Sequence, residues 1–108
     1  MKKHADLLTD LGRFSEPALL IMISLADSPK HGYAMTQDIE EMSGQRLGPG
    51  TLYGAIARLE ARKWIEPLPA DDRRRPYRLT GAGQKVLRAR LESLRTVAKI
   101  GHSRLVEN

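Results

Sequence analysis

Apolar residues recur along the first half of the chain in three patterns that each predict a helix. The first helix begins at Ser15 and is apolar on almost every side over residues 19–25. Ser15 suits the N-cap, and Pro17 fits the first turn, where a missing N–H costs little. The Asp-Ser-Pro segment at 27–29 ends the pattern. Because this helix has hardly any polar face, it is expected to be buried nearly all round.

The second helical pattern opens at the His-Gly-Tyr segment 31–33 and stops at Gly44. Glycine is a common residue just past a helix end. An apolar stripe and a charged face alternate along this helix at helical spacing. The side chains expected to be buried are Met35, Ile39 and Met42, and those expected to face water are Asp38, Glu40 and Glu41.

A third helix is predicted from about residue 49 to 62. Its buried line is Leu52, Ile56 and Leu59. The opposite face is small in its middle and has polar, aromatic or basic groups at its edges, which is unusual for a plain solvent-facing surface. This face comprises Gly50, Gly54, Ala57, Arg58 and Ala61, with Thr51 and Tyr53 on its flanks.

Short alternating segments predict a β-hairpin over residues 64–79. Residues 64–66 form the first strand, and residues 76–79 form the second, with Tyr77 and Leu79 on one side and Arg78 on the other. The turn is expected at Ala70-Asp71-Asp72. Three consecutive arginines, Arg73, Arg74 and Arg75, make the return limb basic.

A long helix is predicted after Thr80, whose hydroxyl suits an N-cap. Its apolar positions form a seam of heptad type, with a second apolar line beside it. This seam comprises Leu87, Leu91, Leu94, Ala98, Gly101 and Leu105. A helix with two apolar lines has too little partner surface in so small a chain, so we expect a homodimer built on residues 80–108. The alternative is packing of this helix onto the chain's own first helix.

Charge is concentrated in the middle of the 108-residue chain. Residues 1–41 hold four basic and seven acidic side chains, whereas residues 42–91 hold eleven basic and four acidic ones. A basic stripe this local is typical of a surface that binds a polyanion. The chain has no cysteine, which removes disulfides and thiolate chemistry and suits a reducing compartment. Because the longest apolar run is too short to span a bilayer, we expect a cytoplasmic protein with no membrane association.

The order of these elements is that of a winged helix-turn-helix. The predicted fold is mainly α with a small β-hairpin, and a long C-terminal dimerisation helix follows. Residues 1–14 form an arm or short helix, residues 15–79 the DNA-binding domain, and residues 80–108 the dimerisation helix. A recognition helix needs a face without bulky side chains to approach base edges in the major groove. Its wing needs positive charge to lie along the phosphate backbone.

Four motifs in order resemble the PadR family of transcriptional regulators. They are His31-Gly32-Tyr33, the run Gly50-Thr51-Leu52-Tyr53, the segment Arg58-Leu59-Glu60, and the wing 73–80 with Gly83. The resemblance covers about residues 15–98. It implies a winged-helix domain, a dimer held by the C-terminal helix, and repression by binding an operator.

The chain departs from the family pattern just after the recognition helix. Lys63 stands where these proteins commonly carry a small residue, often Gly, so the helix end is expected to be drawn out differently. Trp64 replaces an aliphatic residue and is expected to fill part of the core or the dimer interface. Some relatives bind flat drugs between tryptophans at the dimer centre, and the last helix here has no aromatic residue to support that mode. The sequence identifies no small-molecule effector.

The predicted function is a dimeric, sequence-specific DNA-binding regulator, most simply a repressor at a near-palindromic operator. The candidate DNA-binding residues are Tyr33, Thr51, Tyr53, Gly54, Arg58, Lys63, Arg73, Arg74 and Arg75, and the candidate dimerisation residues are Leu87, Leu91, Leu94, Ala98 and Leu105. The alternative is a winged-helix module for protein–protein association. His4, His31 and His102 lie on different elements, so neither an enzyme site nor a metal site is expected, and no cofactor is implied.

Overall fold

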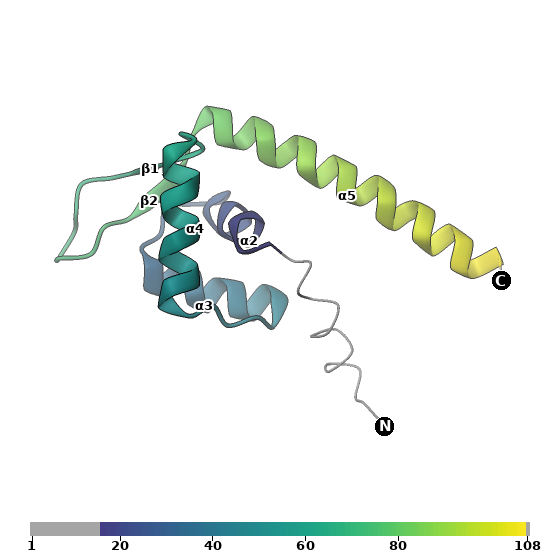
Figure 1. Ribbon diagram of the computed structural model, residues 1–108, viewed down its shortest axis with the longest axis horizontal. Coiled ribbons are helices and arrows are strands. Elements are labelled where there is room, and N and C mark those ends of the chain that lie inside the picture. Colours follow the sequence, from purple (N-terminus) through teal and green to yellow (C-terminus); the bar gives the residue numbers. More distant parts are fainter. Residues whose placement is uncertain (1–15, 108) are drawn as a thin grey trace, which may run out of the picture.

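The computed structural model describes residues 16–107. In this range the chain forms four helices and one two-stranded antiparallel hairpin, which confirms the mainly helical fold expected from the sequence. The elements are α2 (Pro17–Leu25), α3 (Gly32–Ser43), α4 (Pro49–Ala61), β1 (Ile65–Pro67), β2 (Tyr77–Leu79) and α5 (Gly81–Glu107). Figure 1 shows α2, α3 and α4 gathered into one body, with the hairpin extending from one side and α5 from the other. The arm predicted over residues 1–14 lies outside the described residues.

Helix α2 lies at the centre of the core and contacts α3, α4, α5 and β2. Ile21 is fully buried, and Leu20, Met22 and Leu25 are each less than a tenth exposed. This burial on several sides follows from a helix with hardly any polar face. The N-cap is Glu16, whose side chain makes no capping hydrogen bond, and Ser15 lies outside the described residues.

Helix α3 starts and stops where the sequence predicts. His31 is its N-cap, and Gly44 ends it with a φ of 76°, a left-handed conformation that glycine adopts without strain. Two details of its faces differ from the prediction. Met42 is 42% exposed, because none of the described elements covers the last turn. Asp38 is half-buried instead of facing water, because its carboxylate accepts a hydrogen bond of 2.6 Å from the Ser24 hydroxyl on α2.

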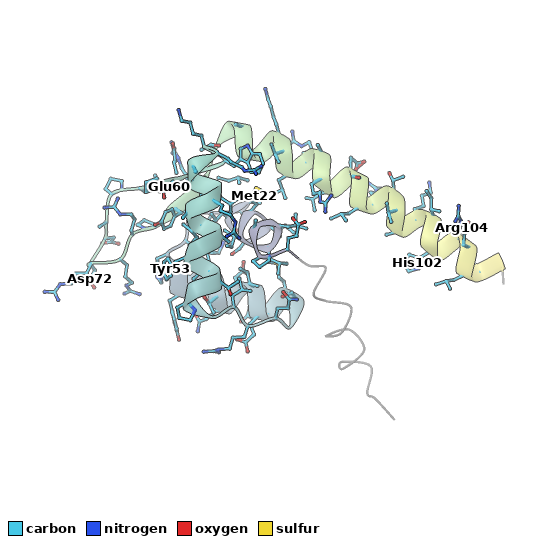
Figure 2. The ribbon with its side chains drawn as sticks, viewed as in Figure 1. Met22, Tyr53, Glu60, Asp72, His102 and Arg104 are labelled. Atoms are coloured by element: carbon cyan, nitrogen blue, oxygen red, sulfur yellow. The ribbon has the colours of Figure 1, made fainter. Side chains whose placement is uncertain are left out.

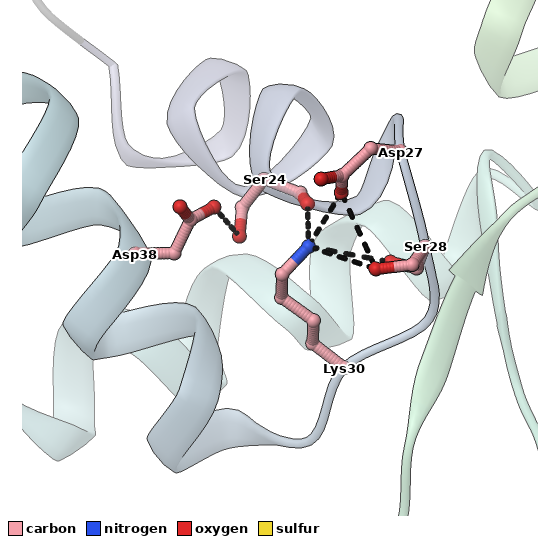
Figure 3. Close-up of polar contacts among 5 residues, drawn as sticks. All are labelled: Ser24, Asp27, Ser28, Lys30 and Asp38. Atoms are coloured by element: carbon pink, nitrogen blue, oxygen red, sulfur yellow. Dashed lines mark hydrogen bonds and ion pairs between the residues drawn. The ribbon is translucent and has the colours of Figure 1, made fainter.

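A polar cluster lies at the end of α2, where Figure 3 shows the Lys30 side chain directed at Ser24, Asp27 and Ser28. The Lys30 ammonium donates to the carbonyl of Ser24 at 2.5 Å and to the carboxylate of Asp27 at 2.6 Å. The hydrogen bond and the positive charge of Lys30 both lower the pKa of the Asp27 carboxyl. Lys30 also pairs with Tyr77 of β2 through two backbone hydrogen bonds of 3.1 and 2.9 Å. Lys30 therefore links β2 to the end of α2 through both its side chain and its backbone.

The hairpin turns more tightly than the sequence predicts. Ile65 pairs with Leu79 and Pro67 with Tyr77, so each strand is three residues long. At the tip, Asp71 and Arg74 exchange backbone hydrogen bonds of 2.7 and 2.8 Å. Asp72 and Arg73 therefore form the turn, with φ values of 48° and 67°. Positive φ at both central residues is the signature of a type I′ turn, whose twist matches the flanking strands. The predicted turn at 70–72 was placed too early.

The exit from α4 also corrects a prediction. Lys63 has a φ of 62°, so the chain leaves the helix in the left-handed conformation that glycine would favour. The N–H groups of Lys63 and Trp64 donate to the carbonyls of Glu60 and Leu59 at 2.9 and 3.1 Å. These two bonds form a Schellman motif, which satisfies the carbonyls of the last turn. The hydrogen bonds of the motif therefore hold lysine in a conformation that costs about 1–2 kcal/mol.

Helix α5 begins against the exit of α4. The Thr80 hydroxyl accepts a hydrogen bond of 3.0 Å from the N–H of Gly83, as an N-cap should, and donates to the carbonyl of Lys63 at 2.7 Å. A Cβ on Gly83 would collide with the carbonyl group of Trp64 and would lie 2.9 Å from the Leu79 side chain. Glycine is therefore required here for the close approach of two backbones.

Replacing Lys63 with glycine should stabilise the protein. Relief of the left-handed conformation gains about 1–2 kcal/mol, and the greater freedom of glycine in the unfolded chain takes back about 0.5–1 kcal/mol. Urea unfolding should therefore show Lys63→Gly more stable than the original protein, by up to about 1.5 kcal/mol. Lys63→Ala is the control, since it removes the same side chain but keeps the strain. Equal stability of the two variants would contradict the explanation.

Replacing Gly83 with alanine should destabilise the protein by about 1–3 kcal/mol, because the new methyl group has no space beside the Trp64 carbonyl. Gly81 provides a matched control two residues away, where a Cβ meets nothing within 4 Å. Gly81→Ala should leave stability unchanged or raise it slightly, since alanine favours helix. Thermal unfolding of both variants measures the difference, and a Gly83→Ala variant as stable as Gly81→Ala would refute the packing argument.

Candidate nucleic-acid interface

The exposed face of α4 is shaped as the sequence predicts. Leu52, Ile56 and Leu59 are each 3% exposed or less and hold the helix against the core. On the other side, Thr51 and Tyr53 are exposed and Gly54 is half-buried. The side chains near the middle of this face are small, so the helix axis can come close to another surface. Ala55, which the sequence analysis did not assign, is also fully buried.

Tyr53 connects α4 to the start of α3. A Cβ on Gly32 would run into the Tyr53 phenol, so the ring lies across the glycine. This contact gives Gly32 a physical role that its place in the His-Gly-Tyr motif did not reveal. Tyr53 remains 53% exposed and Tyr33 64% exposed. Both rings therefore offer large surfaces and hydroxyl groups to a partner, and the Tyr33 hydroxyl already accepts a hydrogen bond of 3.2 Å from Gln37.

The arginines of the hairpin differ in what they contact. Arg73, at the turn, has no ion pair among the described residues, and its side chain is exposed. Arg75 donates a hydrogen bond of 3.1 Å to the carbonyl of Leu68 on the opposite limb. Arg78 is paired with Glu66 across the strands at 2.5 Å. The free charge of the hairpin therefore lies near its tip and return limb.

Arg74 reaches back toward α3. Its guanidinium nitrogen lies 3.3 Å from Nε2 of His31, the N-cap of that helix. The two residues are 43 positions apart in sequence, and only the folded hairpin brings them together. His31 was not among the predicted DNA-binding residues, and no local sequence pattern could have revealed the pairing.

A cavity of about 370 Å³ lies where α5 leaves the body, and a smaller one of about 200 Å³ lies between the hairpin and the two helices. The smaller cavity is lined by His31, Gly32, Tyr33, Tyr53, residues 73–75 and Tyr77. Burial raises the pKa of Tyr77, and the negative charge of Glu60 raises it further while Arg75 opposes the shift. The lining has three arginines and no carboxylate, so it favours an anion.

Lys63 lies apart from the other candidate residues. It follows the C-terminus of α4, whereas Thr51 and Tyr53 lie in the first turns of that helix. A helix of 13 residues is about 20 Å long. If an extended ligand binds, Lys63 can therefore contact it only at a different part from the residues that line the cavity.

The predicted dimerisation residues fall into two groups, one buried in the chain's own core and one exposed. Leu87 is 5% exposed and packs in its own chain's core, because this turn of α5 lies against α2. Its assignment to a seam between chains is therefore corrected. From residue 88 to residue 106 every side chain is exposed. The exposed apolar residues include the predicted Leu91, Leu94, Ala98 and Leu105, together with Val97, Ile100 and Val106.

The candidate DNA-binding surface and the candidate dimerisation surface lie on opposite sides of the molecule. Figure 2 shows Asp72 at the tip of the hairpin and Tyr53 on α4, whereas His102 and Arg104 lie on the far part of α5. Among residues 16–107, no cluster of three or more potential metal ligands occurs. No helix in the described range is long and apolar enough to cross a membrane.

Comparisons with known proteins agree with this geometry. Residues 20–89 match the model of the transcriptional regulator PadR-like family. The chain is 38% identical over 84 residues to the transcriptional regulator Rv3488 of Mycobacterium tuberculosis. The aligned region covers 75% of this chain and 78% of that protein. It resembles the crystal structure of a PadR family transcription regulator from Clostridium difficile, with 26% identity, a TM-score of 0.74, and coverage of 82% of this chain and 97% of that one.

A third relative is much longer than this chain. An uncharacterized 37.1 kDa protein in transposon TN4556 of Streptomyces fradiae is 48% identical over 82 residues, which are 76% of this chain but only 24% of that protein. The match therefore spans about a quarter of the longer protein. With these similarities and the winged-helix arrangement of α2 to β2, the chain belongs to the PadR-like family of transcriptional regulators.

Proposed function

We propose that this regulator binds duplex DNA as a homodimer and represses transcription from a near-palindromic operator. The observation that carries the proposal is the combined surface formed by the small face of α4 and the basic hairpin. Thr51 and Tyr53 are exposed on that face, and arginines 73–75 line one cavity together with Tyr53. An exposed helix with small residues fits the major groove, and a basic hairpin fits the neighbouring phosphates.

The residues of this surface divide between readout and anchoring. Thr51, Tyr53 and Gly54 form the part of α4 that approaches base edges. Arg58, one turn further along, flanks Gly54 with its guanidinium 3.6 Å from where a Cβ would stand. Arg58, Arg73, Arg74, Arg75 and Tyr33 contact phosphates, and Lys63 contacts the backbone at the other end of α4. The anchoring residues supply most of the affinity and its dependence on salt.

The C-terminal half of α5 supplies the dimer contact. Its apolar seam comprises Leu91, Leu94, Ala98 and Leu105, all of which are exposed in the described chain. At 27 residues the helix is about 40 Å long, about twice the length of the 13-residue α4. Burying each of these leucines against a second copy contributes about 1.5–3 kcal/mol. A two-fold axis through this contact presents two recognition helices to half-sites about 34 Å apart.

The repressor role is inferred from the family resemblance. Binding to duplex from upstream of the protein's own gene, compared with scrambled duplex across a salt series, tests the function directly. Tighter binding to the upstream duplex supports a site-specific regulator, and no binding to either duplex at low salt favours protein–protein association instead.

Replacing Arg58 with alanine should weaken binding to specific and scrambled duplexes by a similar factor. If Arg58 neutralises one phosphate, the slope of log Kd against log salt concentration should fall by about 1. Lys99→Ala is the matched control, since Lys99 is an exposed cation on α5, far from the proposed interface. Fluorescence anisotropy across the salt series measures both slopes. An unchanged slope for Arg58→Ala, or an equal drop for Lys99→Ala, would contradict the assignment.

Replacing Leu94 with aspartate should dissociate the dimer, because it places a charge in an apolar contact. Leu94 is 39% exposed in the described chain, so the fold does not depend on it. Arg95→Asp is the control: it introduces the same side chain one residue further on, about 100° around the helix. Sedimentation equilibrium should show a monomer for Leu94→Asp and a dimer for Arg95→Asp. A dimer in both cases would refute the proposed seam.

A further inference from the structure

Gly32 is the first residue of α3 and is buried. Among the described residues, Gly44 is the glycine with positive φ, so the backbone at Gly32 has a helical conformation that alanine also adopts. Glycine is a poor helix former, because it loses more conformational freedom on folding than alanine does. Neither the backbone conformation nor helix propensity therefore explains a glycine at this position.

The space around Gly32 explains it instead. A Cβ on Gly32 would run into the hydroxyl oxygen of Tyr53 and would lie 3.0 Å from the ring carbon Cζ. The next atom, Cδ2 of Leu52, would be 3.4 Å away, which is ordinary contact. The end of the Tyr53 ring therefore occupies the place that a side chain at residue 32 would need.

The obstacle at Gly32 differs from the one at Gly83. At Gly83 the blocking atoms include the backbone carbonyl of Trp64, which is fixed by the exit of α4. At Gly32 the nearest atoms lie at the far end of the Tyr53 side chain, which is 53% exposed. The Tyr53 hydroxyl makes no hydrogen bond within the described part of the chain. A methyl group at residue 32 would therefore turn the ring outward, and the rest of the fold would stay in place.

The position of the Tyr53 ring matters for the small face of α4. Tyr53 is the bulky side chain at the edge of that face, next to Gly54. The ring now ends over Gly32, on the side of α4 that packs against α3. An α-helix with its side chains is about 10–12 Å across, and the major groove is about 12 Å wide. A ring turned outward would therefore hold α4 away from the base edges.

Tyr53 also borders two cavities. Gly32, Tyr33 and Tyr53 line both the cavity of about 200 Å³ beside the hairpin and another of about 280 Å³ beside the connection from α3 to α4. The lining of the second cavity also includes Leu47 and Pro49. A change in the position of the ring would reshape both cavities, so its effect would extend from the hairpin to the start of α4.

We propose that Gly32 is a positioning residue for sequence recognition: by leaving room for the Tyr53 ring, it lets α4 approach the base edges. The inference rests on the proposed DNA-binding function and gives a role in specificity to a buried residue. Contacts with base edges require α4 to enter the groove, whereas the hairpin arginines reach phosphates outside it. Loss of the room at Gly32 should therefore reduce sequence preference more than total affinity.

The experiment compares Gly32→Ala with the original protein. A preferred duplex is first selected from a random-sequence pool with the original protein, and Kd is then measured by fluorescence anisotropy for this duplex and for a scrambled one. Gly32→Ala should bind the selected duplex about tenfold more weakly, a loss typical of one good base contact. Its Kd for the scrambled duplex and its salt slope should change little, because the phosphate contacts remain.

Gly81→Ala is the matched control. Gly81 is also the first residue of a helix, and a Cβ there meets nothing within 4 Å. This variant should bind both duplexes as the original protein does. The NMR signals of the Tyr53 ring should shift in Gly32→Ala and stay in place in Gly81→Ala, and thermal unfolding should show both variants folded at the temperature of the binding measurements.

A second substitution tests whether Gly32 acts through Tyr53. Tyr53→Phe removes the hydroxyl oxygen, which is the atom nearest to the added methyl group, and leaves Cζ 3.0 Å away. When Gly32→Ala and Tyr53→Phe are combined, the ring needs to move by only a few tenths of an ångström. The double variant should therefore recover most of the sequence preference that Gly32→Ala loses.

Four results would overturn the inference and leave DNA binding standing. They are an unchanged preference in Gly32→Ala, an equal loss of affinity for both duplexes, no recovery in the double variant, and unfolding of Gly32→Ala at the temperature of the measurements. The last would show that the ring cannot give way to a methyl group. If the original protein selects no sequence from the pool, the sequence-specific function fails together with the inference.

Discussion

The need to cover α2 on several sides shapes the rest of the body. Its side chains offer water hardly any polar surface, and Ile21 is completely buried. Burying each such side chain contributes about 1.5–3 kcal/mol, so leaving one side uncovered is costly. Helices α3 and α4, the strand β2 and the start of α5 all pack against it. The only buried polar residue of the described core, Ser24, donates its hydroxyl to Asp38 and so adds a specific contact between α2 and α3.

Besides the packing of Ile65 and Leu79 in the core, Lys30 joins the hairpin to that body by hydrogen bonds. Lys30 satisfies the carbonyl of Ser24 with its ammonium group and pairs with Tyr77 through its backbone. Its side chain is mostly buried, 16% exposed, so this cation serves the fold and adds nothing to the exposed positive surface. Because the pairing with Tyr77 places the return limb beside α3, Arg74 comes within contact distance of His31. The connection between α2 and α3 thus contributes to the position of the basic hairpin.

Among residues 16–107, backbone strain from positive φ is confined to the hairpin tip and the end of α4. Asp72 and Arg73 at the hairpin tip, and Lys63 after α4, are the non-glycine residues with positive φ in the described range. Each is held by paired backbone hydrogen bonds, which supply the constraint that glycine would make unnecessary. At the hairpin tip, the conformational energy cost of positive φ falls on the same segment as the exposed arginines. At Lys63 the strain is purely structural, since it turns the chain from α4 into β1.

Much of the architecture follows from periodicity and end signals alone. The buried line of α4, the αL stop at Gly44 and the cap at Thr80 were all predictable, because each depends on residues within one or two turns of one another. The basic and small-residue face was predictable for the same reason. The burial of Met42 and the place of Leu87 in a seam between chains were predicted wrongly. An apolar stripe shows which side of a helix is apolar but not how much of that side a neighbouring element covers. Lys63 was misjudged because local propensity is a weaker constraint than the hydrogen bonds of the whole exit.

The residues of the candidate site could be predicted from the sequence in part, but their contacts with one another could not. Tyr53, Arg58 and the arginine run could be singled out from sequence, because their chemistry and their place beside small residues are local properties. The packing of Tyr53 on Gly32 and the pairing of His31 with Arg74 could not, since they join segments 21 and 43 residues apart. The sequence by itself determined which helices form, which of their faces are apolar and where the positive charge collects. Only the tertiary structure decided which of those groups share one cavity, because that depends on how the hairpin folds back over the helix that α2 holds in place.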